Sequence, residues 1–388
     1  MFIQEVKNEL TEHIIPFWSS LKDEENGGFY GYMGYDLKLD KKADKGVILH
    51  SRILWFYSKC YSVLKDKKCL ELANHAFEFV KNHSIDYDNG GVYWMLDYKG
   101  NPVDTMKHTY NIAFAIYALS AYYNASGEKF ALDLAYKLFD DIETNTLDEY
   151  GYREAFSKDW KLISNDALSE NGLMADKTMN TILHLIEAYT ELLKAGKNPR
   201  VESRLRFLLS QVSDKVFDVD NDMLKVFFDT KLEVIGDIHS YGHDIEATWL
   251  IDLACETIGD KELTEKFKNI NLRISENIYN LAYEDGALNT ERDKEHIEKK
   301  RVWWVQAESV VGFINAYQKS GNEKYLDVAK EIWEYIKVGM IDKREGSEWF
   351  NEVGFDGKPF EHKEIVGPWK CPYHNGRMCL EVISRGIE

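Results

Sequence analysis

The sequence has little of what would place it in several large protein classes. It contains only five cysteines, an odd number with no Cys-x-x-Cys pair. This argues against a disulfide framework and agrees with a reducing cytoplasm. No run approaches the ~18 apolar residues needed to span a bilayer, and the charged N-terminus lacks the apolar core of a signal peptide. We therefore expect a cytoplasmic protein. The chain also has only six prolines, and we expect none of them in the interior of a helix.

Positive charge is also scarce. The 48 Lys and Arg residues are outnumbered by 66 Asp and Glu residues, which gives a formal net charge of -18. Such a chain is unsuited to nucleic acid or to anionic membranes. Aromatic residues are plentiful, with 10 Trp and 23 Tyr. They suit a cleft that stacks on sugar rings, although they are also ordinary core residues. We expect a neutral small-molecule substrate.

A weak internal repeat is the most informative feature of the chain. Short turn segments recur six times, separated by about 60 to 70 residues, the length of two helices and their loops. They are ENGGFYGYM near Gly27, DNGGVYWML near Gly90, DEYGYREAF near Gly151, DNDMLKVFF near Asp222, EDGALNTER near Gly286 and REGSEWFNEV near Gly346. Their glycines and alternating aromatic residues predict short β-hairpins.

Two kinds of helix alternate between these turns. One kind is apolar on nearly all sides, as buried helices are, and occupies 47–64, 109–123, 178–193, 243–255, 303–317 and the run after Arg377. The other is amphipathic, as in 70–83, 129–143 and 323–337. With an N-terminal helix at about 3–20, this predicts an all-α fold, an (α/α)6 barrel of six inner and six outer helices. We expect one catalytic domain over 1–388, working as a monomer.

Polar residues interrupt the apolar inner helices near their N-terminal ends, which together surround one end of such a barrel. The set is His184, His243, His374, Arg52, Asn180 and Glu246. A single buried histidine is usually a satisfied core residue, and Arg52 could form a structural ion pair with Glu246. Burying the whole set unpaired would cost about 1–3 kcal/mol for each group, so a polar cavity explains it better. His50 and His108 lie at similar helix starts, so position alone does not select the catalytic histidines.

The sequence contains two sets of possible metal ligands, but neither set is complete. His239, His243 and Glu246 would offer two imidazoles and a carboxylate on a continuous helix, yet Gly242 is expected to break or start that helix. The segment WKCPYHNGRMC holds two cysteines and a histidine without a fourth ligand. We therefore expect no metal.

Paired carboxylates are a further possibility, because glycoside hydrolysis uses two of them. Glu246 and Glu308 are the salient acids on the inner helices. Three histidines beside them favour removal of a proton from carbon over acetal cleavage. Aromatic residues lie at the same helix ends, namely Tyr110, Trp303, Trp304 and Trp369. Several around one cavity indicate a stacking surface for pyranose rings.

Six long segments carry a resemblance to known enzymes: KADKGVILHSRILWFYS, DTMKHTYNIAFAIYALS, LSENGLMADKTMNTILHLIEAYTE, SYGHDIEATWL, RVWWVQAE and GPWKCPYHNGRMC. They resemble the cellobiose 2-epimerase branch of the N-acylglucosamine 2-epimerase superfamily. The resemblance implies an (α/α)6 barrel without an essential metal or organic cofactor. It places proton transfer at His243 and His374 and a third active-site histidine at His184. The implied substrate-side positions are Arg52, Tyr110, Asn180, Glu246, Trp303, Trp304, Glu308 and Trp369.

The activity implied by the resemblance is inversion at C2 of the reducing-end glucose of a β-1,4-linked disaccharide, such as cellobiose or lactose. The ring must open before C2 becomes acidic, and a cis-enediolate is then reprotonated on its other face. Histidine suits these steps because its pKa lies near 6.5. Arg52 would stabilise the enediolate charge, and Glu246 would orient His243 or bind a hydroxyl.

Other functions stay open on the sequence alone. The nearest are an N-acetylglucosamine 2-epimerase and a mannose or glucose isomerase of the same superfamily. An (α/α)6 glycoside hydrolase and a sugar-binding protein without catalysis are more distant alternatives. The long matches RVWWVQAE and GPWKCPYHNGRMC favour the disaccharide branch.

Overall fold

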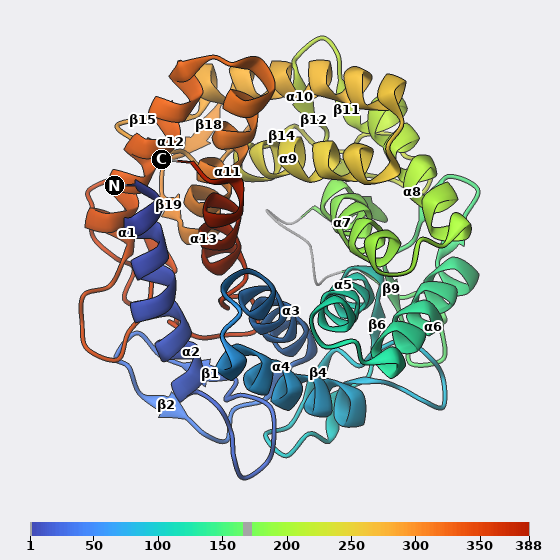
Figure 1. Cartoon of the computed structure of the whole chain (residues 1–388). Helices are drawn as coiled ribbons and strands as arrows, with labels where there is room; N and C mark the ends of the chain where they lie inside the picture. The colour runs from blue at the N-terminus through green and yellow to red at the C-terminus, as the bar shows by residue number, and fades with distance from the viewer. Residues whose placement is uncertain (1, 166–172, 388) are drawn as a thin grey trace.

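The computed structural model describes residues 2–165 and 173–387 and has the expected double ring of helices (Figure 1). The inner ring consists of α3 (Val47–Leu64), α5 (Thr109–Ser126), α7 (Met179–Gly196), α9 (Tyr241–Ile258), α11 (Trp303–Ser320) and α13 (His374–Arg385). The outer ring contains α4 (Lys67–Phe79), α6 (Lys129–Asn145), α8 (Pro199–Gln211), α10 (Lys261–Leu281) and α12 (Glu323–Tyr335). The (α/α)6 prediction is confirmed. The first residues of the LSENG motif, 168–172, lie outside the described residues.

A two-residue turn joins each of the first five inner helices to the next outer helix, and local sequence specifies it. The first residue has a left-handed backbone, and the side chain of the second accepts a hydrogen bond from an N–H of the new helix. The five turns are Lys65-Asp66, Gly127-Glu128, Lys197-Asn198, Gly259-Asp260 and Gly321-Asn322. These caps fix where the inner helices end and turn the chain back along the barrel.

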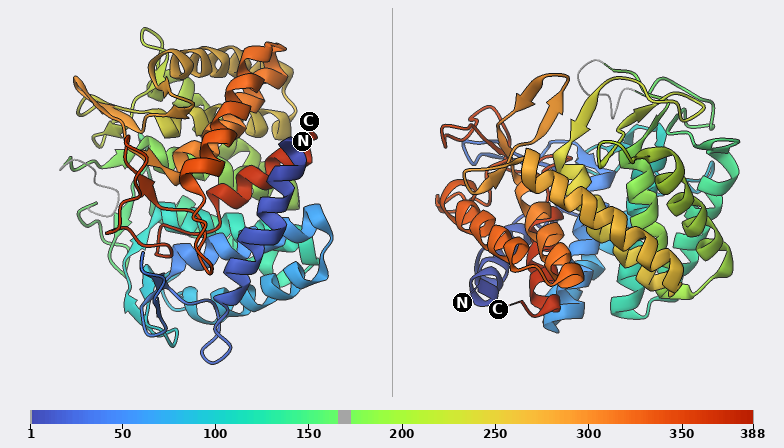
Figure 2. Two further views of the ribbon diagram at one scale, coloured as in Figure 1. Left: turned by 90° about the vertical axis from the view of Figure 1, so that its left-hand side faces the viewer. Right: turned by 90° about the horizontal axis from the view of Figure 1, so that it is seen from above.

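The N-terminal helix completes the outer ring against α13. It is continuous through α1 (Phe2–Asn8), the π-helical η1 (Glu9–Ile14) and α2 (Ile15–Ser20). Pro16 lies inside it, so the expectation that no proline falls within a helix is wrong. Proline has no N–H and cannot donate the usual backbone hydrogen bond of an α-helix. The π-helical turn that ends at Ile14 already changes the hydrogen-bond pattern just before Pro16, so the proline is tolerated there. The two termini lie side by side, away from the strands (Figure 2).

Three outer helices also end in a π-helical turn. These turns are η2 (Val80–Ser84) after α4, η3 (Val212–Val216) after α8 and η4 (Ile336–Met340) after α12. Each turn leads into one of the predicted hairpins. Within the described ranges, no helix combines the length and hydropathy of a membrane span.

The six predicted hairpin turns are all present, each closed by short antiparallel pairing. The pairs are Lys22 with Phe29, Ile85 with Val92, β7 (Leu147–Asp148) with β8 (Gly151–Tyr152), β11 (Phe217–Asp218) with β12 (Met223–Leu224), β15 (Tyr283–Glu284) with β16 (Ala287–Leu288), and Ile341 with Trp349. The hairpins therefore follow the outer helices and return the chain towards the inner ring.

A second set of strands links neighbouring repeats at the end of the barrel where the inner helices begin (Figure 2). A strand just before an inner helix pairs with a strand of the following repeat: β3 (Lys45–Gly46) with β4 (Met95–Leu96), β6 (Lys107–His108) with β9 (Ala155–Phe156), β10 (Lys177–Thr178) with β13 (Phe227–Phe228), β14 (Ile238–Ser240) with β17 (Glu291–Asp293), and β19 (Arg301–Val302) with β20 (Glu352–Val353). Met33 and Val366 bridge the first and last repeats. The remaining strands, β1 (Tyr32–Met33), β2 (Leu39–Asp40), β5 (Pro102–Asp104) and β18 (His296–Glu298), extend this rim.

A buried cationic or imidazole side chain lies shortly before every inner helix and is tied to the surrounding chain. The pairs are Lys45 with Asp23, Lys107 with Asp86, Lys177 with Asp148, His239 with Asp244, and Lys370 with Glu348, while Arg301 donates to Asn289 and to the Glu284 carbonyl. In the first three repeats the acid belongs to the preceding hairpin. These pairs hold the hairpins against the inner helices that carry the site.

Lys107→Met is expected to lower the free energy of unfolding by about 3–5 kcal/mol, because Asp86 would remain buried without its counter-charge. The two side chains are fully buried and 2.7 Å apart. Urea denaturation measures the change. The double variant Lys107→Met/Asp86→Asn removes both charges but keeps the oxygen that accepts backbone N–H bonds, so it should recover much of the loss. Equal stability of the single variant and the native protein would contradict this account.

Candidate functional site

A cavity of about 350 Å³ opens where the inner helices begin, a size suited to a small ligand. All six inner helices or the loops before them contribute to its wall. The predicted site residues in this wall are Arg52, Tyr110, Asn180, His184, His243, Glu246, Trp303, Trp304, Trp369 and His374. Val302, Asn351, Glu352, Lys363, Glu364 and Lys370 complete it. The structure therefore brings together every predicted site residue except Glu308.

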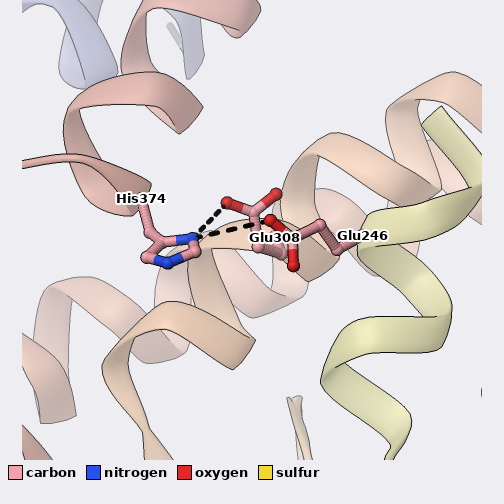
Figure 3. A group of neighbouring side chains, drawn as sticks. All are labelled: Glu246, Glu308 and His374. Atoms are coloured by element: carbon pink, nitrogen blue, oxygen red, sulfur yellow. Dashed lines mark hydrogen bonds and ion pairs between the residues drawn. The ribbon is translucent and has the colours of Figure 1, made fainter. Parts of the chain in front are cut away.

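His374 is the first residue of α13, and a carboxylate behind it fixes its ring. Its Nδ1 lies 2.8 Å from Oε1 of Glu308, which is fully buried in α11 (Figure 3). An ionised carboxylate only accepts, so Nδ1 carries the hydrogen and Nε2 is left as a base. Glu308 thus lies behind His374 and not in the cavity wall, which corrects the expectation that it contacts the sugar.

His243 lies in the first turn of α9, and Ser240 orients it. Its Nδ1 is 2.7 Å from the Ser240 hydroxyl oxygen. Gly242 allows the close packing beside it, since a Cβ at this position would lie 2.6 Å from the Trp304 ring. The expectation that Glu246 orients His243 is therefore wrong. Glu246 instead points towards Nδ1 of His374, at 3.9 Å.

The two catalytic candidates share one compartment. The His243 and His374 rings lie 4.7 Å and 5.6 Å from the Trp304 ring, centroid to centroid. They come from different helices and flank the same indole. Trp303 also contacts His374, at 5.3 Å, while Trp369 is 40% exposed at the mouth. Both imidazoles can thus reach one small ligand in the cavity.

Arg52 is a buried cation without a carboxylate partner among the described residues. Its guanidinium donates to the Tyr110 hydroxyl at 2.9 Å and to the Trp369 carbonyl at 3.4 Å, and it lies 4.2 Å from the Phe114 ring centroid. The proposed ion pair with Glu246 is therefore wrong. A buried, uncompensated positive charge at a cavity wall favours an anionic group in the ligand.

Arg377 is the central residue that sequence reasoning missed. It is fully buried and donates to three carboxylates, Glu187, Glu246 and Glu308. Glu187 also lies 2.8 Å from Nδ1 of His184. One guanidinium thus holds the carboxylates that orient two cavity histidines, which joins α7, α9, α11 and α13 beneath the site.

Burial governs the electrostatics of this region. It lowers the pKa of His243 to about 3 and, with the nearby charge of Arg377, holds the pKa of His374 well below its usual value. Both rings are therefore neutral at pH 7 and able to accept a proton. Burial also raises the pKa of Tyr110 to about 12, so its hydroxyl stays protonated.

The sequence-derived metal sets are not assembled. His239 lies in β14, outside the helix, and its Nε2 lies 2.7 Å from Asp244. The described chain does bring together Glu246, Glu308 and His374, whose ligand atoms lie within 4.8 Å of one another. Arg377 donates to both of these carboxylates, so a cation there would meet a fixed positive charge.

Other histidines and hollows lie apart from this cavity. His50 bonds to the backbone around Phe29 and Gly46, and His108 bonds to Asn165, which accounts for both as structural residues. A larger hollow of about 840 Å³ lies beside α10 and β11–β14. Its one histidine, His239, is already held by Asp244.

Fold and site together define an (α/α)6-barrel protein with an acid–base centre in a cavity that suits a small ligand. Residues 28–376 match the family model described as N-acylglucosamine 2-epimerase (GlcNAc 2-epimerase). The chain belongs to the N-acylglucosamine 2-epimerase family.

Known relatives place the chain within this family. It is 67% identical over 388 residues to a cellobiose 2-epimerase of Ruminococcus albus, covering all of both chains. It is 22% identical to human N-acylglucosamine 2-epimerase, over 96% of this chain and 88% of the human one. The crystal structure of a sugar epimerase from a ruminal bacterium superposes over both whole chains with a TM-score of 0.99, at 66% identity.

Proposed function

We propose that the protein epimerises C2 of the reducing-end glucose of cellobiose, and of related β-1,4-linked disaccharides such as lactose. The observation that carries the proposal is the pair of neutral imidazoles, His243 and His374, that both contact the Trp304 indole in a sugar-sized cavity. Full-length identity of 67% to a cellobiose 2-epimerase supports the choice of substrate.

The reaction follows from this arrangement. The ring opens to an aldehyde, which makes the C2 hydrogen acidic, and one imidazole removes that proton. The other imidazole takes up a proton from solvent and delivers it to the opposite face of the planar cis-enediolate, so the configuration at C2 inverts. Such positioned acid–base groups each contribute roughly 10²–10⁴-fold to the rate. His184 lies beside Tyr110 at 5.0 Å and assists proton transfer during ring opening.

Arg52 stabilises the negative charge that develops on the enediolate oxygens. Its guanidinium has no carboxylate partner in the described chain, and its Nε–H is buried without an acceptor. A sugar oxygen supplies that acceptor and gains most when it is negatively charged. Asn180, whose Oδ1 is also buried and unpaired, binds a hydroxyl group. The exposed face of Trp369 receives the second sugar ring at the mouth of the cavity.

The two acids that the sequence singles out, Glu246 and Glu308, do not have the arrangement that a hydrolase needs. Glycoside hydrolysis needs two carboxyl groups on either side of the scissile bond. Here Glu246 and Glu308 are neighbours on the same guanidinium nitrogen, and Glu308 is outside the wall. The N-acetylglucosamine and mannose alternatives share the same chemistry, and a substrate panel separates them.

Incubation with cellobiose in heavy water is expected to place deuterium at C2 of the product, because a proton removed by an imidazole exchanges with solvent. Proton NMR detects both the new mannose-type residue and the loss of the C2 signal. Lactose, mannose and N-acetylglucosamine serve as comparison substrates. Inversion without deuterium would refute the enediolate route, and exclusive turnover of a monosaccharide would refute the proposed substrate.

A further inference from the structure

The carboxylates beneath the cavity outnumber the positive charge that faces them. Glu187, Glu246 and Glu308 share Arg377, and Glu246 and Glu308 accept from the same nitrogen, Nη2. The other titratable or charged groups around Glu246 include His184 from α7, Tyr110 from α5, Arg52 from α3, His374 from α13 and Tyr373 directly before α13. Arg52 is directed to Tyr110 and the Trp369 carbonyl. Two adjacent buried carboxylates on one donor cannot both ionise readily, so the group holds a proton.

Hydrogen-bond donors determine which carboxyl group keeps that proton. Glu308 accepts from Trp249 at 3.0 Å, from the His374 Nδ1 at 2.8 Å and from two nitrogens of Arg377 at 3.2 and 2.6 Å. From the described residues, Glu246 accepts only one hydrogen bond, at Oε1, from Arg377. Each donated hydrogen bond stabilises the ionised form, so Glu308 is the anion of the pair and the proton belongs to Glu246.

Glu187 does not compete for this proton. Burial alone would raise its pKa, but Arg377 and His184 outweigh that effect and lower the pKa to about 2. It accepts from Arg377, from the Tyr373 hydroxyl and from His184. Glu187 is therefore ionised throughout the neutral range.

The second oxygen of Glu246 remains available for a hydrogen bond to a ligand. Oε2 is buried and has no hydrogen-bond partner among the described residues, and Glu246 lines the cavity. We propose that Glu246 is held as a neutral carboxylic acid whose Oε2–H donates a hydrogen bond to an oxygen of the reducing-end sugar. The identity of the ligand rests on the proposed function, whereas the protonation state does not. Burial, followed by the charge of Glu308, raises the pKa of Glu246 to about 7, in agreement with this assignment.

Infrared spectroscopy tests the proton directly, without turnover. The spectrum of Glu246→Gln is subtracted from that of the native protein, at a pH about one unit below the pKa of Glu246. The difference spectrum should show a carboxylic-acid C=O band. Cellobiose should shift this band to lower frequency. Glu154 is the internal control, because its pKa is also raised to about 7 by burial but it lies outside the cavity wall. Its band should not respond to the sugar.

The infrared outcomes separate the two proposals. A missing Glu246 band overturns the neutral acid, and a band that cellobiose leaves unchanged overturns the hydrogen bond to the sugar, provided that NMR shows cellobiose being turned over. A band that is present in a protein inactive on cellobiose keeps the assigned proton but refutes the proposed function.

Kinetics of two variants provide an independent readout. Glu246→Gln retains an N–H donor of similar shape, so its kcat/KM should stay within about 10-fold of the native value. Glu246→Ala removes the donor and should lower kcat/KM by roughly 100-fold. In the native protein, kcat/KM should fall at alkaline pH as Glu246 ionises. This fall should be absent from Glu246→Gln, because an amide does not titrate. Equal, severe losses in both variants would show that the ionised carboxylate is needed and would overturn the proposal.

Discussion

His374→Ala is expected to lower the rate of cellobiose epimerisation by at least about 10³-fold while leaving the protein folded. The variant removes one of the two bases that must act on opposite faces of C2, and a single positioned acid–base group contributes roughly 10²–10⁴-fold. The fold should survive because Glu308 keeps Arg377 and Trp249 as donors. Circular dichroism and the urea midpoint check the fold, and NMR measures the rate.

Hydrogen exchange separates a lost catalytic base from a damaged cavity. If His243 and His374 serve opposite faces, His374→Ala still contains the base for one face. It should exchange the C2 hydrogen of one epimer in heavy water without inverting it. His243→Ala should exchange the C2 hydrogen of the other epimer. Exchange of the same epimer by both variants would contradict the two-face arrangement, as would normal epimerisation by either.

The barrel could be predicted because its signals are local and repeated. An apolar helix, a turn that can adopt a left-handed backbone, a capping residue and an amphipathic helix recur along the chain. Gly127-Glu128, Gly259-Asp260 and Gly321-Asn322 mark those turns in the sequence alone, although their regularity is recognised only once the helices are placed. Pro16 was misjudged because a π-helical turn has no comparable sequence pattern.

Part of the cavity wall could also be predicted, but the pairing beneath it could not. Three inner helices place a charged residue three positions after a histidine: His184 with Glu187, His243 with Glu246, and His374 with Arg377. This spacing indicates a shared helix face. Only the first of these pairs forms within its own helix. The other partners cross to neighbouring helices, since the rotation of each helix in the ring decides which side chains meet.

Because its partners lie on neighbouring helices, Arg377 is a residue whose loss should damage both stability and activity. Arg377→Met is expected to reduce the free energy of unfolding by about 3–5 kcal/mol, because Glu187 and Glu308 would stay buried without a counter-charge. Urea denaturation measures this loss. Epimerisation should fall as well, since the carboxylates that orient His184 and His374 would lose their common anchor.

Two further variants distinguish charge from geometry at this position. Arg377→Lys restores the charge but not the fork that reaches several carboxylates at once, so it should recover part of the stability and little of the activity. Arg377→Met/Glu187→Gln removes one stranded charge and should be more stable than Arg377→Met alone. If Arg377→Met lost less than about 1 kcal/mol, the carboxylates would have to be neutral in the native protein. The orientation of both histidines would then have to come from the packing of Tyr373 and Trp249 around the guanidinium, which lies 4.2 Å and 4.8 Å from their ring centroids.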